Sequence, residues 1–121
     1  MDKNIFKYIV DNADTPVVVI DLDYTIIYMN KSAAASYSRG KDMIGKNIEL
    51  FMSEETRSKI IMTVEWFKED KKNNSIFAYH DKKSNCDIYM IAIRDNDGEL
   101  VGACSHVDSR TPDKAEPFDI D

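Results

Sequence analysis

The segment of residues 86–94 is apolar on both of its faces. In an extended strand Ile88, Met90 and Ala92 share one face, and the other face carries Tyr89, Ile91 and Ile93. When just one face of a sheet is covered, apolar and polar residues alternate along its strands. This segment therefore predicts a sheet covered on both faces: by helices on one side, and by an N-terminal helix, a partner subunit or both on the other.

The remaining elements follow from hydrophobic period and end signals. We expect a short amphipathic helix over residues 2–12, strands at 16–22 and 25–29, a helix at 31–37, a long helix from 53 to about 70, and strands at 75–81, 86–94 and 99–107. Asn30 and Ser53 read as N-caps of the second and third helices. Two strands, a helical insert and three more strands predict an α+β fold, with one antiparallel sheet and its helices on one face.

Composition narrows the class of protein. The 121 residues fit one domain, and 43% hydrophobic with 31% charged residues is typical of a globular chain. A net charge of −6 disfavours nucleic-acid binding. The longest apolar run, residues 16–20, falls far short of the roughly 18 residues of a membrane span, and no signal peptide is visible. Two cysteines without an export signal favour a reducing cytoplasm and no disulfide.

Three segments carry a family resemblance: DNADTPVVVIDLDYTIIYMNKSAAASYS, MIGKNIELF and IAIRDNDGELVG. Their order and spacing resemble the PAS domain family over residues 4–108. The resemblance implies a five-stranded antiparallel sheet whose concave face, covered by helices, encloses a cavity. It also implies sensing of a small molecule, light or redox state, or dimerisation, with the signal passed to an effector. The residues after 108 are too few for an effector domain, so the signal would go to a partner protein.

The sequence lacks the residues that commonly bind cofactors in members of that family. Light-sensing flavin members carry a reactive cysteine on the short helix before the long one, and residues 41–51 contain none. Haem-binding members commonly offer an axial histidine from the helical insert, and residues 31–74 contain none. A covalent thioester chromophore also needs a positioned cysteine, and neither Cys86 nor Cys104 lies in the insert. Flavin or haem held by other groups stays open.

The resemblance and strand alternation together predict which residues line the cavity. These candidates are Val18, Ile20, Ile44, Phe51, Ile61, Val64, Phe77, Tyr79, Met90 and His106. Most of them would serve equally well as plain core, but Tyr79 and His106 each bring a polar group toward an apolar interior. The direction in which the His106 side chain points depends on the turn that precedes its strand. A bulge at Gly98 would turn Cys104 and His106 inward, and a two-residue turn would turn them outward.

The sheet face opposite the helical insert, which we call the outer face, is apolar and indicates an interface. In PAS domains the N-terminal helix and this sheet face commonly build a dimer, so we expect a homodimer through Ile5, Phe6, Ile9, Tyr89, Ile91 and Ile93. The expected division of the chain is an N-terminal cap helix over 1–13, the PAS domain over 14–108, and an acidic, flexible tail over 109–121. Met1 and that tail favour a stand-alone protein over an excised domain.

Three functions remain open. The first is a cytoplasmic sensory module that binds a small apolar molecule and signals through its dimer packing. The second is a ligand-free interaction module, in which Phe77, Tyr79 and Met90 fill the cavity themselves. The third is a small enzyme with His106 as general base, which we disfavour because no nucleophile–base pair is recognisable. A zinc set of Cys86, Cys104, His80 and His106 lacks the spacing of structural sites.

Overall fold

The computed structural model describes residues 3–119 and contains the predicted five-stranded antiparallel sheet. The strand order across the sheet is β2-β1-β5-β4-β3. The elements are α1 (Ile5–Asp11), β1 (Val18–Asp21), β2 (Ile26–Met29), α2 (Lys31–Ser36), η1 (Gly40–Met43), η2 (Ile48–Leu50), α3 (Glu54–Glu69), β3 (Ser75–Asp81), β4 (Cys86–Arg94) and β5 (Leu100–Ser109). The predicted fold class and order of elements are confirmed. The predicted first residue of α1, residue 2, lies outside the described residues.

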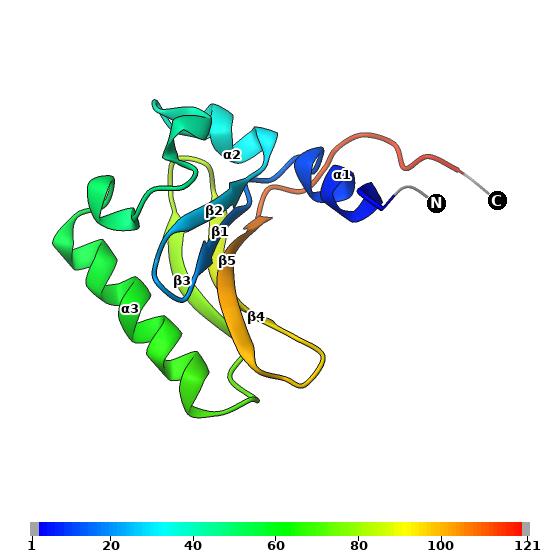
Figure 1. Ribbon diagram of the computed structural model, residues 1–121. Helices are drawn as coiled ribbons and strands as arrows, with labels where there is room; N and C mark the ends of the chain where they lie inside the picture. The colour runs from blue at the N-terminus through cyan, green and yellow to red at the C-terminus, as the bar shows by residue number, and fades with distance from the viewer. Residues whose placement is uncertain (1–2, 120–121) are drawn as a thin grey trace.

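The helices lie on both sides of the sheet, but unequally. Figure 1 shows α3 along one side and α1 beyond the other, at the end of the sheet where the tail leaves. The buried core lies between the sheet and the helical insert, and consists of Ile20, Ile26, Met29, Ala33, Met43, Ile48, Val64, Phe67 and Ala103. Residues of β3 are absent from this core, which leaves that edge strand without a packed layer over it.

Both predicted N-caps form. The side chain of Asn30 accepts a hydrogen bond from the backbone N–H of Ala33, and Ser53 accepts one from Thr56. Each bond satisfies a backbone donor that the first turn of a helix leaves without an internal partner. These two helix starts were predictable because capping depends on residues within one turn of each other.

The C-terminal end of α3 is held by Arg94 of β4. The guanidinium donates to the carbonyl oxygens of Phe67 at 2.7 Å, Asp70 at 3.1 Å and Asn73 at 3.0 Å. It also donates to the carbonyl oxygen of Gly98 at 3.1 Å. One side chain thus joins the C-terminal end of α3 to the β4–β5 turn.

A β-bulge divides β3 into two halves with opposite orientation. Phe77 lies opposite Tyr89, whereas Tyr79 lies opposite Ile88, so Ala78 is an extra residue without a cross-strand partner. An extra residue reverses the face to which the following side chains point. The sequence prediction that Phe77 and Tyr79 share a face is therefore wrong: Tyr79 lies on the α3 side and Phe77 on the outer side.

A second bulge decides the orientation of β5. Gly98 has the positive φ of +81° that the predicted bulged turn requires. By itself that turn would direct Cys104 and His106 toward α3, but the register then skips Val101. The second shift cancels the first, so His106 lies opposite Tyr89 on the outer face. The inward placement of His106 is thus wrong, because it allowed for one irregularity and the hairpin has two.

The two cysteines lie far apart in the sheet. Cys86 lies opposite Ser109, and Cys104 lies opposite Ile91 near the other end of β4. Both are free thiols. Burial raises the pKa of the Cys104 thiol, which favours its protonated form.

Candidate functional site

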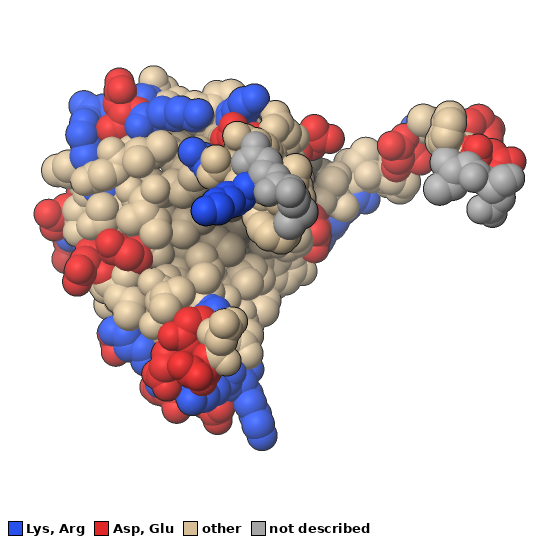
Figure 2. All heavy atoms as spheres, turned by 45° about the vertical axis from the view of Figure 1, so that its right-hand side comes forward, with Lys and Arg blue, Asp and Glu red and all other residues tan. Residues whose placement is uncertain are grey.

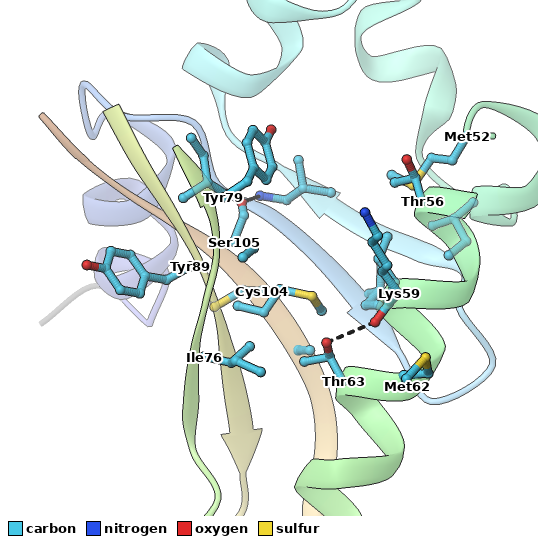
Figure 3. A pocket seen from close by; sticks show the side chains of 18 of the residues that line it. Met52, Thr56, Lys59, Met62, Thr63, Ile76, Tyr79, Tyr89, Cys104 and Ser105 are labelled. Atoms are coloured by element: carbon cyan, nitrogen blue, oxygen red, sulfur yellow. Dashed lines mark hydrogen bonds between the residues drawn. The ribbon is translucent and has the colours of Figure 1, made fainter. Parts of the chain in front are cut away.

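A cavity of about 770 Å³ separates α3 from the sheet. The helix contributes Thr56, Lys59, Ile60, Met62, Thr63 and Trp66 to its wall. The sheet contributes Val18, Ile20, Ile76, Tyr79, Ile88 and Met90, with Ala103 and Ser105 of β5 between them. Figure 3 shows the side chains of Thr63 and Lys59 on one side of this space and those of Ile76, Tyr79 and Ser105 on the other.

The cavity exists because large side chains are kept out of it. The bulge at Ala78 turns the ring of Phe77 to the outer face, where it lies 5.4 Å from the ring of Tyr89. On the inner face, the part of β5 that borders the cavity presents the small residues Ala103 and Ser105, opposite Ala92 and Met90 of β4. These small residues of β5 lie beneath α3, whose C-terminal end is held by Arg94, and the space between them stays unfilled. The filled core expected for a ligand-free interaction module is not what this arrangement produces.

The cavity wall is mainly apolar, with hydroxyl groups placed at intervals. The Oγ of Ser105 accepts a hydrogen bond from the Val18 N–H at 3.0 Å, which leaves its own proton free to be donated. Thr63 donates to the Lys59 carbonyl oxygen at 2.9 Å, within the helix. Burial raises the pKa of Tyr37, and nearby Tyr79 raises it further, so the Tyr37 phenol stays neutral and can donate. Such a wall suits an apolar molecule with one or two polar atoms.

The outer face of the sheet is apolar and open. The rings of Phe77, Tyr89 and His106 form a row, with 5.4 Å and 6.1 Å between successive ring centroids. Ile91 and Ile93 continue this face along β4. Figure 2 shows a hollowed surface without charged side chains in this region, below α1. The outer face therefore resembles an interior surface more than a solvated one.

Helix α1 is tied to the sheet by polar contacts. The Tyr28 hydroxyl donates to the Asp11 carboxylate at 2.9 Å, and burial, aided by that carboxylate, raises the pKa of Tyr28 to about 12. None of the seven residues of α1, all of which the structure describes, is fully buried. Phe6 and Ile9 are exposed, and Ile5 is half-buried. The apolar side of α1 is consequently left without cover.

The start of the tail is clamped to the β3–β4 hairpin. Asp87 accepts hydrogen bonds from His80 Nδ1 at 2.9 Å and from Arg110 Nε at 2.8 Å. The Arg110 guanidinium, and after it His80, hold the pKa of the Asp87 carboxyl below its usual range. His80 and Asp87 lie directly opposite each other in the β3–β4 ladder.

A family comparison identifies the fold. The model of the PAS domain family matches residues 14–109, which is most of the chain. This chain is a PAS domain. PAS domains are generally sensory modules rather than catalytic ones. No curated protein matches the chain.

Solved structures agree with this PAS assignment. A C-terminal domain from Streptococcus mutans is 16% identical, with a TM-score of 0.73, covering 90% of this chain and 85% of that one. A sensory box sensor histidine kinase from Vibrio cholerae is 20% identical, with a TM-score of 0.60, covering 85% and 87%. VqmA bound to DPO, a protein of Vibrio cholerae, is 14% identical, with a TM-score of 0.61, covering 88% of this chain and 56% of that one. At these identities the likeness establishes the fold.

Four of the ten predicted cavity residues line the cavity with their side chains on the α3 side of the sheet. These are Val18, Ile20, Tyr79 and Met90. Phe77 borders the cavity from β3, but its ring points away as described. His106 lies on the outer face, where its Nε2 is 2.8 Å from Asp108.

The other four predicted residues lie away from the cavity of this PAS domain. Val64 is buried in the core beneath it. Ile61 is exposed, because the 100° step of a helix turns it away from the face of Ile60 and Thr63. Ile44 is exposed in the turn after η1, and Phe51 packs under the Arg39 guanidinium, 5.5 Å from the ring centroid.

Sequence reasoning missed the helical wall of the cavity. Met62 and Trp66 lie on a stripe of α3 beside its buried apolar face, and both line the cavity. Thr56, Lys59 and Thr63 extend the same stripe with polar residues. A second stripe that mixes apolar and polar residues, next to a buried one, is the signal that would have indicated a wall.

Neither a membrane-spanning helix nor a metal-binding cluster occurs within the described residues. Between residues 3 and 119 no helix is long and apolar enough to cross a membrane. Over the same range, no cluster of three or more His, Cys, Asp or Glu side chains is placed to hold a metal ion.

Proposed function

We propose that this PAS domain is a sensory module that binds a small, mostly apolar molecule between α3 and the sheet. The observation that carries the proposal is the cavity of about 770 Å³, walled by apolar side chains with a few hydroxyl groups. Ligand sites in proteins typically enclose roughly 300–1,000 Å³ with such a lining. The structural neighbour described as VqmA bound to DPO supports the same use of the fold.

A bound molecule would contact both layers of the domain. It would touch Thr63 and Trp66 of α3 on one side and Met90 of β4 on the other. Tyr89 and Ile91, on the reverse face of β4, belong to the uncovered outer surface. Ligand binding would favour the arrangement of α3 and β4 that fits the ligand best, and would so change the outer surface. The proposed location of this sensor in the cytoplasm rests on the sequence features alone.

Filling the cavity with a side chain is expected to block binding. In Thr63→Trp the indole occupies the space between α3 and β4, and we expect affinity for the uncharged dye Nile red to fall at least about tenfold. Fluorescence titration measures this loss, and native mass spectrometry reports any molecule that co-purifies with the wild type. Ile61→Trp is the matched control, because the same indole then lies on the exposed side of α3. Equal dye binding by both variants, or no binding by the wild type, would contradict the proposal.

The second part of the proposal is a homodimer through α1 and the outer face. Two observations support it: α1 exposes Phe6 and Ile9, and the outer face carries Tyr89, Ile91 and Ile93. Apolar surfaces of this kind are usually covered in a stable assembly. A second copy of the chain offers both surfaces at once, so each α1 can cover the sheet of the other subunit.

A charge on α1 is expected to separate the dimer. Ile9→Glu places a carboxylate in the proposed interface and should weaken dimerisation at least about tenfold. Sedimentation velocity measures the change. Leu50→Glu is the control, because Leu50 is 62% exposed, close to the 61% of Ile9, but lies in η2 on the helical side of the sheet. A wild-type monomer, or an Ile9→Glu variant that remains dimeric, would exclude this interface.

A further inference from the structure

The charge distribution in the cavity wall selects a class of ligand. We propose that the ligand is an amphipathic anion, with its apolar part in the cavity and a carboxylate at its mouth bound by Lys59. This inference rests on the proposed function, since it names the chemistry of the molecule that the same cavity would take.

Lys59 is the charged residue of the cavity. Among the described residues that line it, the others are apolar or carry hydroxyl, thiol, thioether or indole groups. Figure 3 shows the Lys59 side chain leaving α3 and reaching toward the space between the helix and β3. The chain as a whole carries −6, so its general field repels anions. A local cation in the wall is therefore what would let an anion, rather than a cation, bind here.

The ion pair that Lys59 forms leaves its ammonium group able to bind a ligand. The ammonium lies 3.2 Å from Glu55 Oε1, with side-chain exposures of 73% and 81%. Exposed pairs at this helical spacing are weak, because water screens both charges. An ammonium also has three donors, so Lys59 can bind a second carboxylate while it keeps the first.

A second donor lies one turn before Lys59 on the same face of α3. The Thr56 hydroxyl accepts a hydrogen bond from the Ser53 hydroxyl at 3.0 Å, which leaves its proton available. Thr56 and Lys59 are three residues apart and both line the cavity. A carboxylate has two oxygen atoms, so it can accept one bond from each side chain.

The rest of the wall suits a hydrocarbon part. Ile60, Met62 and Trp66 of α3 face Ile76 and Met90 of the sheet across the cavity. An alkyl chain or an aromatic ring between them would remove apolar surface from water on both sides. The cavity thus combines one cationic end with an apolar body.

Three probes with the same alkyl chain test the charge preference. Decanoate, 1-decanol and decyltrimethylammonium, each below its micelle concentration, are used to displace Nile red from the wild-type protein. We expect decanoate to bind most tightly and the cation most weakly, with at least about tenfold between decanoate and the cation. Raising the salt concentration should weaken decanoate binding and leave decanol unchanged.

Substitutions at Lys59 separate its charge from its length. Lys59→Met keeps an apolar stem and should weaken decanoate binding about tenfold with little change for decanol, whereas Lys59→Arg should preserve decanoate binding. Lys68→Met is the matched control: Lys68 is also paired with a glutamate on α3, Glu65 at 3.0 Å, but is not part of the cavity wall. It should leave both probes unaffected.

The outcomes distinguish this inference from the proposed function. Equal binding of decanoate and decanol, or equal effects of Lys59→Met and Lys68→Met, would overturn the anion preference. If decanol still binds and Thr63→Trp still abolishes binding, the apolar cavity site stands without it. If the wild type binds neither Nile red nor any probe, both the proposed function and this inference fail.

Discussion

Replacing Asn30 by alanine is expected to lower the free energy of unfolding by about 3–5 kcal/mol, because several buried groups lose their partners at once. Asn30 is 0% exposed. Its Oδ1 accepts from the N–H groups of Val17 and Ala33, each at 2.9 Å. Its Nδ2 donates to the carbonyl oxygens of Val10 at 3.0 Å and Thr15 at 2.9 Å. In the alanine variant the N–H groups of Val17 and Ala33 and the carbonyl of Thr15 lose this partner, whereas the Val10 carbonyl still accepts from the Ala13 N–H at 3.2 Å.

Chemical denaturation measures the loss, and Ser53→Ala is the control. Ser53 also caps a helix, but its cap is exposed and joins no buried network, so its loss should cost about 1 kcal/mol. If Asn30→Ala costs no more than Ser53→Ala, then Asn30 acts as a simple cap and the buried network contributes nothing.

The Asn30 network also connects regions far apart in the chain. It joins the end of α1 at Val10, the segment before β1 and the start of α2. In Asn30→Ala we therefore expect α1 to become the first site of limited proteolysis, ahead of α3. Faster cleavage in α3 would contradict this order, because the side-chain hydrogen bonds of Asn30 lead to α1, to the segment before β1 and to α2.

Gly102→Ala is expected to destabilise the protein by about 2–4 kcal/mol through overpacking against the backbone. A Cβ at this position would lie 2.4 Å from the carbonyl oxygen of Ile20, in the neighbouring strand β1. Neither strand can move away easily, because β1 and β5 are paired here through Asp21 and Gly102. The obstacle is a backbone atom and not the end of a flexible side chain, so a change of rotamer cannot relieve it.

Gly45→Ala is the control for the Gly102 substitution. Gly45 has a φ of +88°, and nothing lies within 4 Å of the Cβ that alanine would add. Its replacement should cost about 1 kcal/mol of conformational strain without a clash. Thermal denaturation of both variants compares a steric with a conformational cost. A Gly102→Ala protein as stable as Gly45→Ala would mean that β1 and β5 separate at little cost.

Local features of this fold were readable from the sequence. The caps at Asn30 and Ser53 and the positive φ of Gly98 each depend on a few neighbouring residues. The two apolar faces of β4 are another case, since alternation within one strand shows which side chains share a face. Those predictions were confirmed because no distant contact was needed to decide them.

The candidate site was predicted in part. Val18, Ile20 and Met90 line the cavity as predicted. Near these three residues no extra residue interrupts the alternation of their own strand, so their side chains face α3. Lys59 and Trp66 were missed: their shared stripe indicates a second face of α3 in use, but the sequence does not show that this face stands away from the sheet and leaves a space. The position of the helix depends on contacts with distant parts of the chain, such as the hydrogen bond from Arg94 of β4 to the Phe67 carbonyl oxygen.

The sequence by itself therefore determined the order of elements, the antiparallel α+β class and the starts of the helices, since these arise from short-range patterns and backbone sterics. Only the tertiary structure decided the direction of Phe77 and His106 and the presence of an open cavity. Bulges at Ala78 and Val101 follow from how two strands pair, and one shifted residue reverses every side chain beyond it. Unfilled volume likewise depends on how whole layers pack, which no single segment encodes.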